Sequence, residues 1–143
     1  MRIRDVIAAK SEQTVVTVSP SATVRELLGL LAEHNVGALV VSDDGQSVDG
    51  IVSERDVVRR LHENTELLSA TVGSIMTGEV RTCTPDDQLD DLMSLMTERR
   101  IRHVPVCEGE QLVGIVSIGD VVKHKIDALQ FERDQLDSYV HQS

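Results

Sequence analysis

Two short motifs in this chain carry side chains that could bind a sugar or a phosphate. Residues 53–56 (Ser-Glu-Arg-Asp) and residues 117–120 (Ser-Ile-Gly-Asp) each stand where the pattern predicts that a strand ends and a helix begins. A helix start presents free backbone N–H groups and a partial positive charge, which attract anions. An Asp in the first turn can also accept hydrogen bonds from the adjacent hydroxyls of a ribose. Since the Ser-x-x-Asp spacing is also that of a capping box, a structural role and a ligand-binding role are both open.

These motifs belong to two copies of one unit. The nine residues that begin at Gly50 return from Gly114, with seven of the nine identical at an offset of 64. Upstream, the match continues at an offset of 65, as in Pro20 and Pro85. One copy is too small to bury a good core alone, so the two copies are expected to pack against each other. The groove between them is therefore the first candidate for a binding site.

The hydrophobic pattern predicts the same order of elements in each copy, namely strand, helix, strand, strand, helix. In the first copy we expect a helical turn over 3–9, strands over 14–18, 38–42 and 48–53, a helix over 24–33 capped by Thr23 with Glu26 at N3, and a helix over 54–62. In the second copy we expect a short helix over 72–76, strands over 80–83, 103–107 and 111–117, and helices over 87–99 and from 118 to about 141. This order predicts an α+β fold of two pseudo-symmetric repeats, residues 1–70 and 71–143, with small mixed sheets packed against each other.

The last predicted helix carries a row of apolar residues that its own repeat has no obvious surface to cover. The row alternates spacings of 4 and 3 and is interrupted once, at Arg133; its apolar members are Val122, Ile126, Leu129, Leu136 and Val140. Such a heptad pattern is typical of helix pairing between chains. We expect a homodimer contact along this helix, with packing onto its own repeat as the alternative.

Composition excludes several classes of function. The formal net charge of −10 opposes binding to nucleic acid and to an anionic membrane surface. No apolar run approaches the roughly 18 residues that a membrane span needs, and the N-terminus lacks the apolar stretch of a signal peptide. We therefore expect a cytoplasmic protein. Cys83 and Cys107 lie in apolar contexts without a CxxC spacing, which favours free thiols over a disulfide or a metal site.

The motifs of the common enzyme classes are absent from the sequence. There is no HExxH, GxSxG or GxGxxG, and neither cysteine has an evident base nearby. The acidic pairs at 86–87 and 90–91 fit charges at a helix N-terminus better than a metal site. We expect no catalytic residue and no bound metal.

The order of these motifs resembles the CBS domain, named after cystathionine β-synthase. The resemblance rests on a Thr-x-x-Pro turn, an amphipathic helix, an apolar hairpin and the run Gly-Ile-Val-Ser-x-x-Asp-Val-Val. Residues 100–106 (Arg-Ile-Arg-His-Val-Pro-Val) add to it. It covers about residues 3–126, and the tandem arrangement resembles a CBS pair, or Bateman module, of the small stand-alone bacterial type.

What the resemblance implies is regulation and signal transduction rather than catalysis. CBS pairs bind adenosine-containing ligands in two clefts between the repeats, and each cleft takes the Ser-x-x-Asp turn of one repeat and the first strand and hairpin of the other. AMP is the ligand that we expect, with ADP, ATP, NAD(H) and S-adenosylmethionine as further candidates. The ligand would shift the shape of a dimer that an unknown effector protein reads. The alternative is a protein-interaction or dimerisation module without a physiological ligand.

Carried onto this sequence, the resemblance gives each residue of the first cleft a role. Asp56 would hold the ribose, Val80 and Ile101 would flank the adenine, and backbone groups near Arg81 would read its edge. The phosphate would meet the cationic side chains next to Ser53 and on the other repeat: Arg55, Arg102 and His103.

The second cleft differs from the first in its charge. It would combine Ser117 and Asp120 with residues of the first repeat: Val15, Val16, Val36, Gly37 and Ala38. Gly119 stands where the first cleft has Arg55, and residues 37–38 (Gly-Ala) stand where it has an Arg-His pair. We therefore expect this cleft to be empty, or to take a less charged ligand or a larger one such as NAD.

Overall fold

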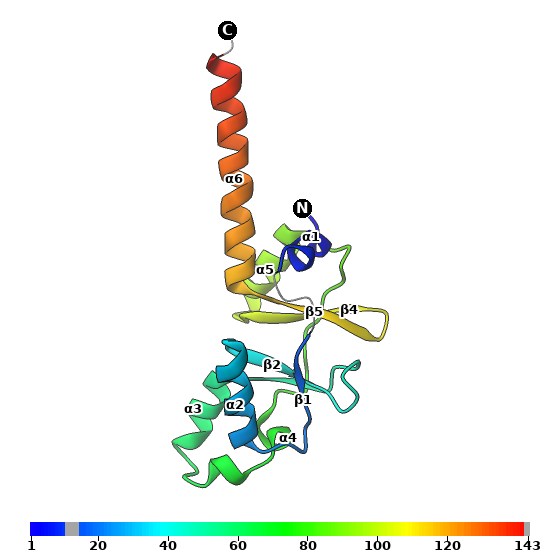
Figure 1. Cartoon of the computed structure of the whole chain (residues 1–143), viewed down its shortest axis with the longest axis vertical. Helices are drawn as coiled ribbons and strands as arrows, with labels where there is room; N and C mark the ends of the chain where they lie inside the picture. The colour runs from blue at the N-terminus through cyan, green and yellow to red at the C-terminus, as the bar shows by residue number, and fades with distance from the viewer. Residues whose placement is uncertain (11–14, 142–143) are drawn as a thin grey trace.

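A computed structural model describes residues 1–10 and 15–141, and it consists of two stacked halves (Figure 1). The first half holds a sheet in the order β1 (Thr17–Val18), β2 (Ala38–Val41), β3 (Gly50–Ser53), with β1 parallel and β3 antiparallel to β2. The second half holds the antiparallel hairpin of β4 (His103–Glu108) and β5 (Gln111–Ser117). The two small sheets and the surrounding helices confirm the predicted α+β class.

The helices begin and end close to where the pattern places them. They are α1 (Ile3–Ala8), α2 (Val24–His34), α3 (Glu54–Leu61), the 3-10 turn η1 (Leu67–Ser69), α4 (Val72–Ile75), α5 (Leu89–Arg99) and α6 (Ile118–His141). The Thr23 hydroxyl accepts a hydrogen bond from the Glu26 N–H at 3.1 Å, which confirms Thr23 as the cap of α2. Behind this cap, Val24, Leu27 and Leu31 form the buried stripe that an amphipathic helix needs.

The strand predicted over 80–83 is wrong. Cys83 makes an isolated parallel bridge to Val106, where its N–H donates to the Pro105 carbonyl at 3.0 Å, and no longer strand forms. The reason is that Arg81 and Thr82 are exposed, so the segment lacks the buried side chains that hold a strand against a core. The predicted strand over 14–18 is shorter than expected within the described residues, since β1 starts at Thr17, and Thr14 lies outside them.

The short helix that packs in each half belongs to the other sequence repeat. Ile3 and Val6 of α1 are buried in the second core, with Val104 and Val121, whereas α4 is buried in the first core. The backbone contacts repeat accordingly: the Gly73 N–H donates to the Pro20 carbonyl, and the Arg4 N–H donates to the Pro85 carbonyl, both at 2.8 Å. The sequence boundary at residues 70 and 71 stays a prediction, but the two packed bodies do not follow it.

The space between the sheets is closed by side chains of both halves. Val40 is fully buried yet belongs to neither core, and its neighbours Leu39 and Val41 point into the first core. Because side chains alternate along a strand, Val40 faces the other sheet. The hairpin loops also meet, since the Leu112 N–H donates to the Gln46 carbonyl at 2.7 Å. These contacts hold the halves face to face.

Helix α6 extends well beyond the second half (Figure 1). Within the described chain, Val121 is the buried residue of this helix. The predicted seam is exposed, from 45% at Val122 to 65% at Leu136. No helix in residues 1–10 and 15–141 is both long enough and apolar enough to cross a bilayer.

Candidate functional site

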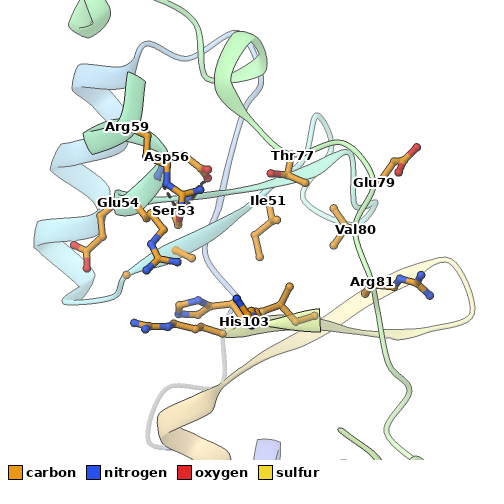
Figure 2. Close-up of a pocket in the computed structure, with 16 residues that line it drawn as sticks. Ile51, Ser53, Glu54, Asp56, Arg59, Thr77, Glu79, Val80, Arg81 and His103 are labelled. Atoms are coloured by element: carbon orange, nitrogen blue, oxygen red, sulfur yellow. Dashed lines mark hydrogen bonds between the residues drawn. The ribbon is translucent and has the colours of Figure 1, made fainter. Parts of the chain in front are cut away.

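A pocket of about 360 Å³ lies between the two halves (Figure 2). Its upper wall in the figure is the end of β3 and the start of α3, and the segment 77–81 and the start of β4 close it. All eight residues predicted for the first cleft line it: Ser53, Arg55, Asp56, Val80, Arg81, Ile101, Arg102 and His103. The remaining lining residues are Gly37, Ala38, Ile51, Glu54, Arg59, Thr77, Glu79 and Arg100. The volume falls within the usual range of ligand pockets, roughly 300–1,000 Å³.

The Ser53–Asp56 turn is a capping box, as the sequence predicts. The Asp56 N–H donates to Ser53 Oγ at 3.3 Å, and the Ser53 N–H donates to Asp56 Oδ2 at 2.9 Å. The Ser53 hydroxyl donates to the same carboxylate oxygen at 3.1 Å. Within the described residues no hydrogen bond reaches Asp56 Oδ1. The turn therefore fixes the carboxylate and leaves one oxygen available, so the structural role does not exclude the binding role.

The opposite wall comes from the loop between α5 and β4, and it repeats a loop of the first half. Arg100 ends α5 with a positive φ of 54°, and Asn35 ends α2 with a φ of 52°. The Ile118 N–H donates to the Arg102 carbonyl at 2.8 Å, and in the first half the Glu54 N–H donates to the Gly37 carbonyl at 3.0 Å. Each loop is thus tied to the helix start of its own repeat, and this bond sets the position of the residues that line the pocket.

The pocket is locally positive in an acidic protein. Five arginines line it, at positions 55, 59, 81, 100 and 102, against the three carboxylates of Glu54, Asp56 and Glu79. The whole chain has a formal net charge of −10. Guanidinium groups bind phosphate oxygens with a planar fork of donors, so this wall suits a phosphate.

Two of the five arginines were not predicted from the sequence. Arg59 stands three residues after Asp56 on α3, and that spacing places both on one helix face. Arg100 directly precedes the predicted Ile101, but its role depends on the left-handed end of α5. The position of Arg59 could have been predicted from the helical spacing. The position of Arg100 could not, because it depends on the backbone conformation at the end of α5.

His103 lies where the two halves meet and is half-buried. Burial lowers its pKa, since it disfavours the charged imidazolium. Asp120 and Glu54 act in the opposite direction, and the cations Lys10 and Arg102 add to the lowering. A Cβ on Gly37 would lie 3.4 Å from Glu54 Oε1 and 3.8 Å from His103 Cε1, so the glycine leaves room between these two side chains.

A second, smaller pocket of about 110 Å³ lies on the other side of the contact between the halves. Its lining is mostly apolar: Ile7, Lys10, Val15, Val16, His34, Val36, Ala38, Leu39, Val113, Gly114 and Ile115. Four residues predicted for the second cleft, Val15, Val16, Val36 and Ala38, are among them. The other three are not, because Gly37 lines the first pocket and Ser117 and Asp120 line neither.

The Asp120 carboxylate is occupied by groups of its own chain. Oδ2 accepts from the Ser117 N–H at 2.9 Å, and the Asp120 N–H donates to Ser117 Oγ at 3.2 Å, which confirms the second capping box. The Lys10 ammonium donates to the same carboxylate oxygen at 3.0 Å. Burial would raise the pKa of Asp120, but the hydrogen bonds from Ser117 and Lys10 outweigh it and hold this pKa below its usual range. Sequence patterns gave no signal for Lys10.

The cysteines are free thiols away from both pockets. Burial raises the pKa of Cys83 to about 12, and the charge of Asp87 and the neighbouring Cys107 add to the shift. A thiol with so high a pKa is a poor nucleophile at neutral pH. Within the described residues no group of three or more His, Cys, Asp or Glu side chains could hold a metal ion.

Comparisons with known proteins agree with this architecture. The family model that describes the CBS domain matches this chain twice, over residues 3–63 and over residues 72–127. CBSX3 of Arabidopsis thaliana, a mitochondrial CBS domain-containing protein, is 40% identical over 123 residues, which are 82% of this chain and 60% of that protein. YhcV of Bacillus subtilis, also a CBS domain-containing protein, is 33% identical over 78% of this chain and 79% of its own length. A protein of Thermofilum pendens, 40% identical, is matched over 46% of its length, so this chain spans only about half of some relatives.

Solved structures show the same fold. A CBS-domain containing protein from Agrobacterium tumefaciens is 40% identical, with a TM-score of 0.82 over 87% of this chain and 99% of that one. CBSX2 in complex with AMP is 30% identical, with a TM-score of 0.75 over 92% and 98%. The CBS domain pair of protein MJ0100, in complex with 5'-methylthioadenosine and S-adenosyl-L-methionine, is 25% identical, with a TM-score of 0.76 over 86% and 98%. With two matched repeats that form one face-to-face pair, this chain belongs to the CBS-domain family.

Proposed function

We propose that this chain is a regulatory module that binds an adenosine-containing nucleotide in the first pocket. The observation that carries the proposal is the pairing of the Asp56 turn of one repeat with an arginine-rich wall of the other, across a pocket of about 360 Å³. The CBSX2 complex with AMP and the MJ0100 complex with two adenosyl ligands support it, because both proteins have this fold. Among AMP, ADP, ATP, NAD(H) and S-adenosylmethionine, AMP is the first candidate, because CBSX2 is in complex with AMP.

The proposed ligand pose follows the geometry of the walls. Asp56 Oδ1 would accept from the ribose hydroxyls, since Oδ2 is held by Ser53. Val80 and Ile101 are half-buried and would sandwich the adenine, with the backbone at Arg81 reading its edge. The phosphate would lie among the arginines Arg55, Arg59, Arg100 and Arg102, with the His103 imidazole beside them.

Signalling would follow from differential binding rather than from chemistry. A nucleotide in this pocket touches both repeats, so it favours the arrangement in which the two walls are closest. A ligand shifts such an equilibrium only by its preference between the two arrangements. We propose that an unidentified effector protein reads the shape, that the chain itself is not an enzyme, and that it works in the cytoplasm, where the free thiols of Cys83 and Cys107 would stay reduced.

We further propose that α6 pairs with the same helix of a second copy. The seam of Val122, Ile126, Leu129, Leu136 and Val140 keeps the heptad spacing and is between 45% and 65% exposed. Each half of the helix carries charges of both signs: Asp120, Lys123, Lys125 and Asp127 in the first half, and Glu132, Arg133, Asp134 and Asp137 in the second. The exposed heptad row is therefore the feature that favours self-pairing.

The proposed ligand is tested by thermal unfolding with AMP, ADP, ATP, NAD, NADH and S-adenosylmethionine. A ligand at about 100 times its dissociation constant adds about 2.7 kcal/mol to the free energy of unfolding, which raises the melting temperature. Asp56→Ala should abolish the shift. Asp120→Ala is the matched control, because it also removes a capping-box carboxylate and Asp120 does not line the first pocket. If no ligand raises the melting temperature, the nucleotide proposal is wrong and α6 becomes the main functional feature.

A further inference from the structure

Within the described residues, hydrogen bonds of Lys10 link the segment after α1 to the second repeat. The Lys10 ammonium donates to Asp120 Oδ2 at 3.0 Å and to the backbone carbonyl of Ile115 at 2.8 Å. The side chains of Lys10 and Asp120 are 30% and 25% exposed. Because both groups are largely covered, water screens this ion pair less than it screens an ion pair on the open surface.

The first pocket has a different arrangement at the equivalent positions. There the carbonyl of Ile51, the counterpart of Ile115, accepts from the backbone N–H of Thr77 at 2.9 Å. The hydrogen bonds of the Asp56 carboxylate go to Ser53, and within the described residues no cation contacts it. In the second repeat, the Lys10 side chain therefore replaces the backbone N–H that binds this carbonyl in the first repeat. The same ammonium also pairs with the Asp120 carboxylate.

The two pockets differ in which of these groups lines them. Lys10 lines the second pocket, and the Ser117–Asp120 turn behind it does not reach the lining. In the first pocket the corresponding Ser53–Asp56 turn is part of the wall. The second pocket is left with about 110 Å³, below the roughly 300 Å³ at which ligand pockets begin.

We propose that Lys10 is the specificity-determining residue of the second cleft: it holds Asp120 as an internal partner, so that a nucleoside can bind there only after the lysine has been displaced. This inference rests on the proposed nucleotide function of the first pocket. The ammonium bonds to Asp120 Oδ2, and Lys10 lines the second pocket whereas Asp120 does not, so the ribose hydroxyls would have to displace the ammonium to reach this carboxylate. The wild-type chain would then bind one AMP, at the Asp56 pocket.

Removal of the lysine side chain should open the second cleft. In Lys10→Ala, the Ser117 N–H still holds Asp120 Oδ2, and the ammonium no longer stands between the carboxylate and the pocket. Equilibrium titration with AMP should give one molecule per chain for the wild type and two for Lys10→Ala. Lys10→Arg, which keeps the positive charge, should bind one. Arg25→Ala is the matched control, because it removes an exposed positive charge of α2 away from both pockets and should also leave one.

A double variant separates this proposal from the function on which it rests. Asp56→Ala should bind no AMP, and Asp56→Ala with Lys10→Ala should bind one, at the second cleft. One AMP in both the wild type and Lys10→Ala would overturn the role of Lys10 and leave the first pocket standing. Two AMP in the wild type would overturn it as well. No binding to any of these proteins would overturn both proposals.

The wild-type protein offers a second test that needs no variant. The chain has three lysines, Lys10, Lys123 and Lys125. Acetylation by an N-hydroxysuccinimide ester, followed by mass spectrometry, should modify Lys10 several-fold more slowly than the exposed Lys123 in the absence of nucleotide. A rate for Lys10 equal to that of Lys123 would contradict a held ammonium.

Discussion

Arg100 ends α5 in the same left-handed backbone conformation with which Asn35 ends α2, at φ values of 54° and 52°. Asparagine tolerates this conformation well, whereas an arginine adopts it at a cost of roughly 1 kcal/mol. Backbone strain of this kind collects at functional sites, where another requirement keeps the residue in place. Arg100 lines the first pocket, and we infer that its guanidinium group is this requirement.

Exchanging these two residue types should therefore have opposite effects. Arg100→Asn should raise the free energy of unfolding by about 0.5–1 kcal/mol and weaken AMP binding, because the strain and one cation are both removed. Asn35→Arg should lower the free energy of unfolding by a similar amount. Urea unfolding and AMP titration measure the two quantities. Equal stability of Arg100→Asn and the wild type would show that the arginine is not strained.

Gly50 is predicted to be essential for the shape of the first pocket. A Cβ at this position would lie 2.8 Å from the Thr77 carbonyl oxygen and 2.7 Å from Met76 Sδ. Gly50→Ala should therefore push the 77–81 segment away from β3, at a cost of about 1–3 kcal/mol in unfolding free energy and with weaker nucleotide binding.

The control for this substitution is Gly29→Ala in α2. A Cβ there would meet no atom within 4 Å, so the substitution should stabilise the helix by about 0.5–1 kcal/mol. Urea unfolding of both variants gives the comparison. If Gly50→Ala is as stable as Gly29→Ala, the close approach of the 77–81 segment to β3 is not required.

His103 should make the fold less stable as the solution becomes acidic. Its pKa in the folded state lies below the unperturbed 6.5, because burial disfavours the imidazolium. The unfolded chain therefore takes up the proton first, and stability is lost as the pH falls below about 6.5. Urea unfolding at pH 7.5 and 5.5 should show a larger loss for the wild type than for His103→Gln. His62→Gln, at an exposed position, should behave like the wild type; equal losses in all three proteins would exclude this role of His103.

Leu129 tests the helix pairing. It is 52% exposed at the middle of the α6 seam, and a charge there would face the second copy. Leu129→Glu should convert the proposed dimer into a monomer of 15.7 kDa by light scattering. Asp127→Lys changes the charge outside the seam and should leave the dimer intact. A wild-type protein that is already a monomer at high concentration would rule out self-pairing.

The sequence predicted the local elements and the composition of the first pocket well, since both depend on short-range patterns. The two Ser-x-x-Asp turns are capping boxes, and the eight predicted residues of the first cleft line one pocket. Long-range relationships were not predictable in this way. The contact between Lys10 and Asp120 joins residues 110 positions apart, and nothing in the pattern around Lys10 marks it.

The strand predicted over 80–83 does not form, for a similar reason. The repeat offset aligns Val80 and Thr82 with Val15 and Thr17, so a strand was predicted at both places. Identical residues in two repeats can nevertheless differ in how deeply they are buried. In the folded chain, residues 80–82 run along the pocket wall, and Cys83 alone of this segment is both buried and bridged within the described residues. A ligand-lining segment and a core strand can share the same residue pattern.

The exchange of short helices between the two halves also sets an order of events during synthesis. Ile3 and Val6 are synthesised about 100 residues before Val104 and Val121, which belong to the core that buries them. The first core, by contrast, is complete once Ile75 has emerged. Because contacts of large sequence separation form slowly, the first half should fold before α1 packs into the second core. The second core should therefore form after the first core.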